Sequence, residues 1–148
     1  MLVNGEDITT AIRLPEVSAA ASQVAAVPAV RAYLLEMQRA LARTHHVIMD
    51  GRDIGTVVLP EADCKVFLTA SAEVRAQRRC RELEQRGTPQ EYESVLADMR
   101  CRDEQDRNRT VAPLKQAEDA VLLDTSEMDF EESAAALLRL IKEKIHEA

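Results

Sequence analysis

The stretch HVIMDGRDIGTVVLP, residues 46–60, decides the fold class. An apolar run of strand length at 47–49 is followed directly by DGRD at 50–53, which places two carboxylates and a guanidinium at its end. In open parallel sheets, ligands bind outside the carboxyl ends of the strands. The charge at 50–53 therefore predicts that this strand points toward a ligand.

Two further apolar runs of strand length follow, CKVFLTA at 64–70 and AVLLDTS at 120–126. Neither contains Gly or Pro, and both end in polar residues, at 69–71 and 124–126. Helical patterns of about 15 residues or more are expected between these runs, so parallel crossovers are favoured over hairpins. The pattern predicts one α/β domain with a parallel sheet.

The helices are expected between and around these strands. Residues 15–43 read as two helices with a break near Val27-Pro28. A helix from Ser71 should stop at Gly87, and TPQE at 88–91 resembles a capping box that starts the next helix. Asp129 should open the last helix, whose apolar stripe is Leu137, Leu138, Ile141 and Ile145.

Composition narrows the function classes. The chain has 148 residues with 46% apolar content, which suits one domain with a core. No run of 18 apolar residues predicts a membrane span, and MLVNGEDITT does not resemble a signal peptide. The three cysteines, in no metal-ligand spacing, favour reduced thiols and a cytoplasmic protein. A net charge of −7 argues against nucleic acid as a partner.

The basic residues are concentrated in one segment. Between Arg75 and Arg109 lie nine Arg and no Lys, and Arg suits planar, bidentate contact with phosphate or carboxylate. At about 100° per residue, Arg102, Asp106 and Arg109 fall within roughly 60° of one another on a helix. The alternative is a solvated helix pair whose arginines form ordinary i,i+4 ion pairs with the interleaved Glu and Asp.

Four motifs resemble the bacterial cytidylate kinases: GEDIT at 5–9, ASQVAAVPAVR at 21–31, MDGRDIGTVVLPEADCKVFLTAS at 49–71 and RDEQDRNRTVAPL at 102–114. The resemblance covers essentially the whole chain in the order of the family. It implies the three-layer P-loop fold of nucleoside monophosphate kinases, which is an α/β fold with a parallel sheet. It also implies transfer of the γ-phosphoryl group of ATP to CMP or dCMP, with Mg²⁺.

The resemblance implies which residues contact the acceptor nucleotide. Ser22 and Arg31 resemble contacts to the cytosine, and Arg52 resembles the arginine that binds the acceptor phosphate. Asp53 resembles the carboxylate that holds the sugar hydroxyls, and Asp106 a further sugar contact or a residue that orients an arginine.

The resemblance also implies which residues bind substrate phosphates, which belong to the lid over ATP and which lies near the metal. Arg102 and Arg109 are similar to lid-side arginines that grip phosphates, and with Arg52 they form the expected catalytic set. Arg78 and Arg79 resemble the basic lid over ATP. Asp50 ends its strand where this fold class often keeps a carboxylate near Mg²⁺. Phosphoryl transfer of this kind needs positioning and charge neutralisation rather than a protein nucleophile.

One family feature is absent from the sequence. None of its four glycines belongs to a G-x-x-x-x-G-K-[ST] loop, whose amides cradle donor phosphates. In the family this loop precedes the first residue here, so residues 1–148 are expected to form a partial domain without the central P-loop strand. Its regions would be 1–45 for CMP binding, 46–74 and 110–148 for the core, and 75–109 for the lid. By itself the chain should be inactive and marginally stable, and a complementing P-loop segment is an expected partner.

Other functions stay open at this point. The chain could be a CMP-binding or regulatory module without kinase activity. An Arg-helix protein for RNA or acidic partners is disfavoured by the acidic total and the 3% aromatic content. Adenylate, guanylate and shikimate kinases are the near alternatives among enzymes, and the joint presence of SQVAA, DGRDIGT and DRNR favours cytidylate kinases over them.

Overall fold

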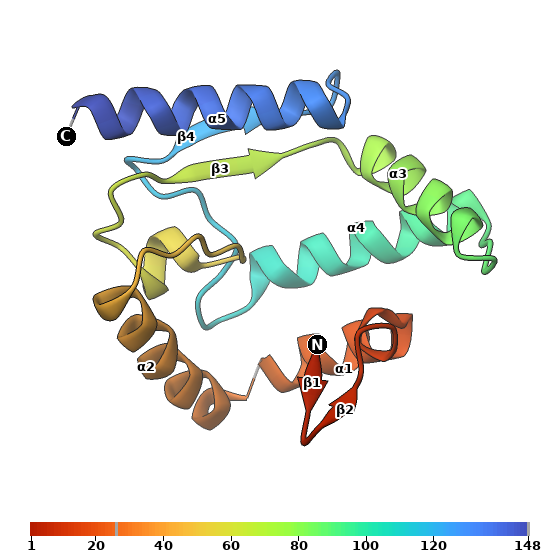
Figure 1. Ribbon diagram of the computed structural model, residues 1–148. Coiled ribbons are helices and arrows are strands. Elements are labelled where there is room, and N and C mark those ends of the chain that lie inside the picture. The colour runs from red at the N-terminus through yellow and green to blue at the C-terminus, as the bar shows by residue number, and fades with distance from the viewer. Residues whose placement is uncertain (26, 148) are drawn as a thin grey trace. The chain divides into compact units, whose positions relative to one another are not determined.

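The computed structural model describes residues 1–25 and 27–147, apart from the side chains of Pro15, Ser18, Ser22, His146 and Glu147. The chain divides into two units, residues 1–48 and 49–148. Figure 1 shows the elements of both units. Each unit is described by itself below. No helix among the described residues is long and apolar enough to cross a membrane.

The N-terminal unit begins with a small hairpin that the sequence analysis missed. Strands β1 (Leu2–Val3) and β2 (Glu6–Asp7) pair antiparallel, with Leu2 opposite Asp7. Asn4 and Gly5 connect them with φ values of 51° and 87°. An Asn-Gly pair readily takes this left-handed backbone and favours tight hairpin turns. The Asn4-Gly5 pair was therefore a sequence signal that could have predicted this hairpin.

Helices make up the rest of this unit. A short 3₁₀ turn, η1 (Ala11–Arg13), precedes α1 (Pro15–Ala25) and α2 (Pro28–Thr44). The predicted break is confirmed, because Val27 has an extended backbone and Pro28 occupies the first turn of α2. Proline at that position loses no helical hydrogen bond, since its N–H would be unpaired there anyway.

The C-terminal unit is a parallel α/β arrangement. Its strands β3 (Val66–Thr69) and β4 (Val121–Asp124) pair in parallel, with Val66 opposite Val121. Its helices are the π-helix η2 (Ile54–Val58), α3 (Ala72–Gln85), α4 (Tyr92–Asn108) and α5 (Phe130–Glu147). Figure 1 shows α3 and α4 side by side, and these two helices pack against each other. The predicted α/β class with an incomplete parallel sheet is confirmed.

The strand predicted at 46–49 is wrong. These residues have no regular secondary structure, and Ile48 is 96% exposed. A strand forms only when its backbone N–H and C=O groups find ladder partners. The sheets of the described residues pair only β1 with β2 and β3 with β4, so no strand is available to hold 46–49.

The capping box predicted at 88–91 is also wrong. Helix α4 begins at Tyr92, and Glu91 precedes it without a side-chain cap. Residues 87 and 88 instead close the end of α3, where the Thr88 N–H donates to the Leu83 carbonyl and the Gly87 N–H to that of Glu84. Gly87 has a φ of 74°, which makes this a Schellman cap. Thr88 therefore serves the preceding helix.

The apolar packing of both units is thin. One core cluster joins α3 and α4 through Ala76, Leu83, Val95 and Leu96. The two strands expose apolar side chains, with Leu68 59% and Leu122 56% exposed. The accessible surface is 11025 Å². Two separate compact bodies with the masses of these units would expose roughly 9,000 Å² in total.

We expect low stability of the chain by itself. Because so much apolar surface and one edge of β3 stay exposed, thermal unfolding should be broad and centred below about 45 °C. Circular dichroism at 222 nm, combined with light scattering, measures this. A sharp cooperative transition in a monodisperse monomer would contradict the expectation.

Candidate functional site

Two arginines and two aspartates from distant parts of the sequence meet in the C-terminal unit. The Arg52 Nε donates to Asp106 Oδ2 at 2.9 Å, and the Arg109 guanidinium lies 3.4 Å from Asp53 Oδ1 and 3.9 Å from Asp106 Oδ1. Both aspartates are buried, with exposed fractions of 9% and 8%. We call these four residues the arginine–aspartate cluster. All four had been singled out from the sequence, and the structure brings them together.

Local structure fixes the cluster from two sides. Asp53 precedes the π-helix η2, and its carbonyl accepts from the N–H groups of Val57 and Val58. Val58 is 4% exposed and anchors this turn in the interior. Single π-helical turns are rare and often lie at functional sites. The irregular turn thus holds Asp53 against the C-terminal end of α4.

The chain turns back after α4 and completes the other side. The Leu114 N–H donates to the Asp106 carbonyl at 2.8 Å, and the Arg109 Nε donates to the carbonyl of Ala112. Ala112 has a φ of 50°, an uncommon left-handed conformation for alanine. These contacts restrict the Arg109 guanidinium to the side of the turn that faces Asp53.

Arg102 does not join the cluster. Its side chain is exposed, and the described residues offer it no partner, whereas Asp106 one turn later is buried. Arg102 and Asp106 both lie in α4, as the expected shared face requires, whereas Arg109 directly follows the helix with an extended backbone. Only Asp106 and Arg109 join the cluster. A helix angle places residues on a face, but it does not say how far a long side chain reaches.

Asp50, the expected metal-side carboxylate, is exposed. Among the described residues, no group of three or more His, Cys, Asp or Glu could hold a metal ion. Mg²⁺ in nucleotide sites usually keeps several waters and binds one or two carboxylates plus substrate phosphates. A single exposed carboxylate is compatible with that pattern, while a preformed metal site made by protein ligands alone is not present in the described part of the chain.

The two expected lid arginines make contacts within the protein. Arg78 donates to the carbonyls of Thr125, at 2.6 Å, and of Met128, at 2.9 Å. It thereby ties α3 to the loop after β4. Arg79 binds Glu82 of its own helix at 2.7 Å. Neither residue lines the cleft described below.

The two residues expected to contact the cytosine, Ser22 and Arg31, belong to the N-terminal unit. Arg31 lies in the first turn of α2, and its NH1 donates to the Ala25 carbonyl at the end of α1 at 3.3 Å. Its guanidinium therefore helps to join the two helices. The side chain of Ser22 lies outside the described residues, so its role stays an expectation.

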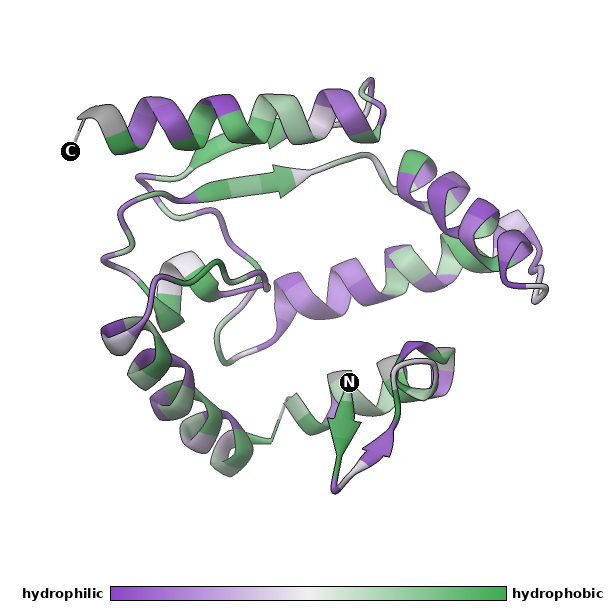
Figure 2. Ribbon diagram, in the orientation of Figure 1, coloured by the Kyte–Doolittle hydropathy of each residue, from purple (hydrophilic) through white to green (hydrophobic). Residues whose placement is uncertain are grey.

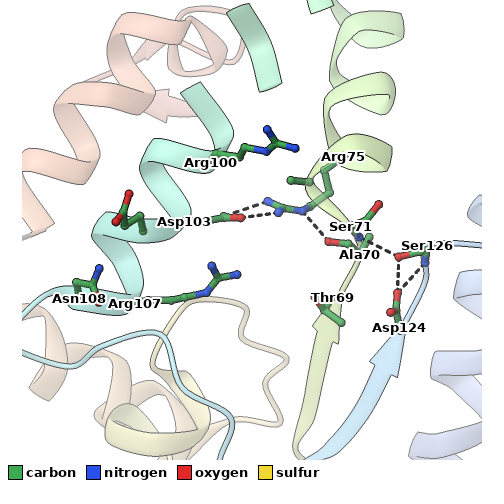
Figure 3. A pocket seen from close by; sticks show the side chains of 12 residues that line it. Thr69, Ala70, Ser71, Arg75, Arg100, Asp103, Arg107, Asn108, Asp124 and Ser126 are labelled. Carbon is green, nitrogen blue, oxygen red and sulfur yellow. Dashed lines mark hydrogen bonds and ion pairs between the residues drawn. The ribbon is translucent and has the colours of Figure 1, made fainter. Parts of the chain in front are cut away.

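A cleft of about 680 Å³ opens at the carboxyl ends of β3 and β4, where the sequence predicted ligand binding (Figure 3). It is lined by Thr69, Ala70, Ser71, Ala72, Arg75, Arg100, Asp103, Glu104, Arg107, Asn108, Asp124 and Ser126. The lining thus combines both predicted strand ends with one face of α4. Three arginines and three acidic residues balance its charge.

The loop ends of the two strands are hydrogen-bonded to each other within this cleft. The Ser71 N–H donates to Ser126 Oγ at 2.8 Å, and the Ser126 hydroxyl donates to Asp124 Oδ1 at 2.6 Å. Hydrogen bonds from the hydroxyl and then from the backbone N–H of Ser126 lower the pKa of Asp124. The cleft floor therefore keeps a carboxylate that is ionised at neutral pH.

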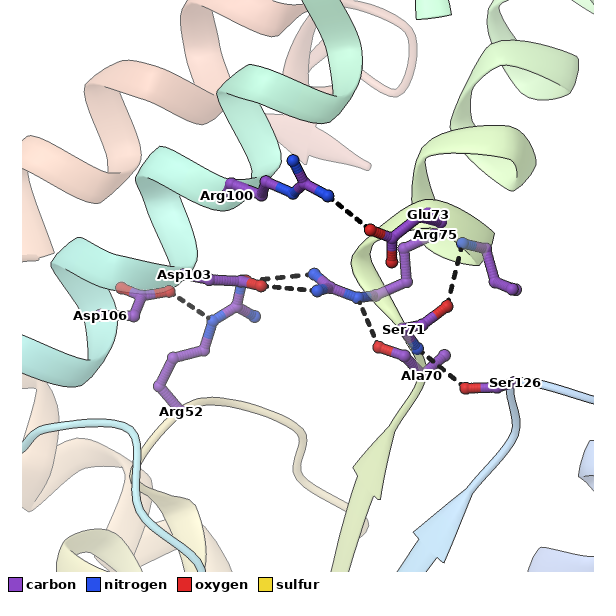
Figure 4. Close-up of polar contacts among 10 residues, drawn as sticks. Arg52, Ala70, Ser71, Glu73, Arg75, Arg100, Asp103, Asp106 and Ser126 are labelled. Atoms are coloured by element: carbon purple, nitrogen blue, oxygen red, sulfur yellow. Dashed lines mark hydrogen bonds and ion pairs between the residues drawn. The ribbon is translucent and has the colours of Figure 1, made fainter. Parts of the chain in front are cut away.

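Sequence reasoning missed the ion pair that crosses this cleft. Arg75 donates from NH1 and NH2 to the two carboxylate oxygens of Asp103, and from Nε to the Ala70 carbonyl at 3.0 Å (Figure 4). The Arg-rich segment was the available signal for this ion pair, and Asp103 is one of several acidic residues interleaved with its arginines. Sequence spacing could not tell which acid pairs with which arginine.

Comparison with known proteins decides the family. A sequence model described as cytidylate kinase matches residues 1–143. The chain belongs to the cytidylate kinase family. It is 50% identical to a cytidylate kinase of Carboxydothermus hydrogenoformans over 97% of this chain and 65% of that protein. It is 47% identical to one of Aeromonas salmonicida over 100% of this chain and 64% of that protein.

A third cytidylate kinase, from Paramagnetospirillum magneticum, is 52% identical over 91% of this chain and 66% of that protein. This member of the cytidylate kinase family thus spans slightly less than two thirds of the length of these relatives. The four motifs that resembled the family in the sequence all lie within the matched residues. The resemblance is therefore confirmed at the level of the family.

Proposed function

We propose that this chain supplies the acceptor-binding and lid parts of a cytidylate kinase, which transfers the γ-phosphoryl group of ATP to CMP or dCMP. The observation that carries the proposal is the arginine–aspartate cluster, in a chain of this family. Its four residues come from segments 50–53 and 106–109. Arg52, Asp53 and Asp106 match residues that the resemblance assigns to the acceptor, and Arg109 matches a lid-side arginine that grips phosphates. Fold alone would support many activities, so the proposal rests on this site.

The cluster suits a nucleoside monophosphate chemically. In the proposed complex, Arg52 binds the acceptor phosphate and Asp53 accepts hydrogen bonds from the sugar hydroxyls. Within the described part of the chain, Arg52 is engaged through its Nε, by Asp106, so its two terminal nitrogens can grip phosphate oxygens in a bidentate manner. Asp106 keeps the guanidinium oriented, which lowers the entropy lost when the phosphate binds.

Arg109 and Arg102 are proposed to act on the transferring group. Arg109 is held by Asp53 and by the turn at 112, while Arg102 is exposed and able to reach a ligand. Phosphoryl transfer spreads negative charge over the equatorial oxygens, and positioned guanidinium groups stabilise that charge. Ser22 and Arg31 are proposed to contact the cytosine from the N-terminal unit.

The donor side is proposed to be incomplete in this chain. The cleft at the strand ends offers arginines and the N-terminus of α3 to ATP phosphates, and Arg78 and Arg79 lie on that helix. Mg²⁺ would neutralise charge on the phosphates, and Asp50 is the protein carboxylate proposed to lie near it. Without a G-x-x-x-x-G-K-[ST] loop, we propose that the chain by itself does not transfer phosphate and that a P-loop segment complements it.

A second candidate is a CMP-binding module without kinase activity. It is favoured because the arginine–aspartate cluster is formed while the sequence contains no P-loop motif. Such a module would bind CMP as tightly as the proposed enzyme does. It would differ by remaining inactive after a P-loop segment is added.

Calorimetric titration of the 148-residue chain with CMP, dCMP, AMP and cytidine tests the acceptor site at low temperature. We expect CMP to bind with a dissociation constant below about 1 mM, and AMP and cytidine at least tenfold more weakly. Equal affinity for CMP and cytidine would contradict a phosphate-binding role of Arg52. Equal affinity for CMP and AMP would contradict the choice of acceptor.

A further inference from the structure

The second half of α4 is held by charge rather than by apolar packing. Its buried apolar residues, Val95 and Leu96, lie in the first half, where α4 packs on α3. From residue 100 onward the only buried residue of the helix is Asp106. Figure 2 shows the same change along the helix, from apolar near α3 to hydrophilic toward its C-terminal end. This half carries residues of the proposed phosphate site.

Ion pairs replace the apolar contacts at intervals of three residues. Arg100 pairs with Glu73, Asp103 with Arg75, Asp106 with Arg52, and Arg109 with Asp53. The first two partners lie on α3, and the other two lie in the loop at 50–53. Figure 4 shows the first three of these pairs. A segment that depends on such pairs has low local stability if one of them is lost.

The Arg75–Asp103 pair is the best formed of the four. Both terminal nitrogens of Arg75 reach both oxygens of Asp103, and the Nε reaches the Ala70 carbonyl at the end of β3. The side chains are 34% and 15% exposed, whereas those of Arg100 and Glu73 are 60% and 50% exposed. Bidentate geometry fixes orientation as well as distance. One guanidinium therefore connects β3, α3 and α4.

We propose that Arg75 and Asp103 are positioning residues that set the placement of the second half of α4. Asp106 lies three residues after Asp103 on α4, and Arg109, which directly follows α4, lies three residues further. A displacement at 103 would therefore move Asp106 away from Arg52 and Arg109 away from Asp53. The loop at 50–53 has no regular secondary structure, whereas Arg75 lies on a regular helix, so the Arg75–Asp103 pair offers α4 the more regular support. The consequence for CMP rests on the proposed function.

Amide hydrogen exchange of the 148-residue chain at 10 °C tests this placement. In Asp103→Asn and in Arg75→Lys, amides of residues 104–108 should exchange at least about tenfold faster, because either change removes the bidentate ion pair. Amides of 95–99, held by packing on α3, should change less than about twofold. The double variant Arg75→Asp with Asp103→Arg swaps the two charged side chains. It should restore much of the protection that either of these substitutions alone removes.

Arg86→Gln is the matched control, since Arg86 pairs with Glu82 of its own helix at 2.5 Å. It should leave the exchange of 104–108 unchanged. Unchanged exchange in both Asp103→Asn and Arg75→Lys would overturn the proposal. Loss of protection throughout β3, α3 and α4 in these variants would also overturn it, because the pair would then stabilise the whole unit.

CMP titration of the same variants separates this inference from the proposed function. We expect Asp103→Asn and Arg75→Lys to raise the dissociation constant for CMP about tenfold, although neither residue belongs to the arginine–aspartate cluster. Faster exchange at 104–108 in a chain that never binds CMP would keep the positioning role and reject the function. CMP binding in the unmodified chain, with affinity unchanged in both variants, would reject the positioning role alone.

Discussion

Arg52→Ala should reduce kcat/KM for CMP by about 10³-fold in the complemented enzyme, a loss typical of a missing donor at the reacting group. The reason is that Arg52 offers two free terminal nitrogens to the acceptor phosphate while its Nε is held by Asp106. Arg52→Lys should show a smaller loss, because an ammonium keeps the charge without the planar fork. A coupled assay with CMP, ATP and Mg²⁺ measures both variants.

Arg86→Ala is the control for this experiment, as an exposed arginine outside the cluster. It should retain the activity of the unmodified chain. Arg52→Ala with activity within about threefold of that control would show that another residue binds the acceptor phosphate. If the only change were a higher KM for ATP, Arg52 would act on the donor side instead.

Asp106→Ala should lower the free energy of unfolding by about 2 kcal/mol, as expected when a buried carboxylate that accepts a hydrogen bond from a partly exposed arginine is removed. Asp106 lies between Arg52 and Arg109, and its side chain is 11% exposed. Its removal leaves two guanidinium groups facing each other without a carboxylate between them. Urea denaturation at low temperature, followed by circular dichroism, measures the change.

Glu104→Ala provides the comparison on the same helix, because Glu104 is exposed. It should change the free energy of unfolding by no more than about 0.5 kcal/mol. Similar values for Glu104→Ala and Asp106→Ala would mean that the cluster contributes nothing to stability. The cluster would then be a weak surface arrangement of the kind common in proteins.

Local signals in the sequence predicted much of the fold. Pro28 predicted the break between α1 and α2, Gly87 the end of α3, and Asp129 the start of α5. Asp129 and Glu132 indeed cap each other reciprocally, with hydrogen bonds of 2.8 and 2.9 Å. The two strands at 66–69 and 121–124 pair in parallel as predicted. Each of these features depends on neighbours in the sequence or on a single crossover.

Features that depend on distant partners were predicted less well. The run at 46–49 has strand composition but no ladder partner, and composition alone cannot supply one. The resemblance to the family predicted Arg52, Asp53, Asp106 and Arg109 as site residues, yet gave no account of the pairing that joins them. The Arg75–Asp103 pair was missed because its residues are 28 positions apart among many similar charges. The apolar runs and turn residues therefore carried information on elements, and much less on ion pairs.

The most direct test of the account is the coupled phosphotransfer assay with CMP, ATP and Mg²⁺. It is run on the 148-residue chain by itself and on a mixture with a segment that carries a family-type strand, G-x-x-x-x-G-K-[ST] loop and helix. We expect activity only in the mixture, with CMP preferred to AMP, because the chain supplies the acceptor and lid parts and the segment supplies the phosphate loop. The account would be contradicted if the chain by itself were as active as the mixture. It would also be contradicted if a mixture that binds CMP showed no activity.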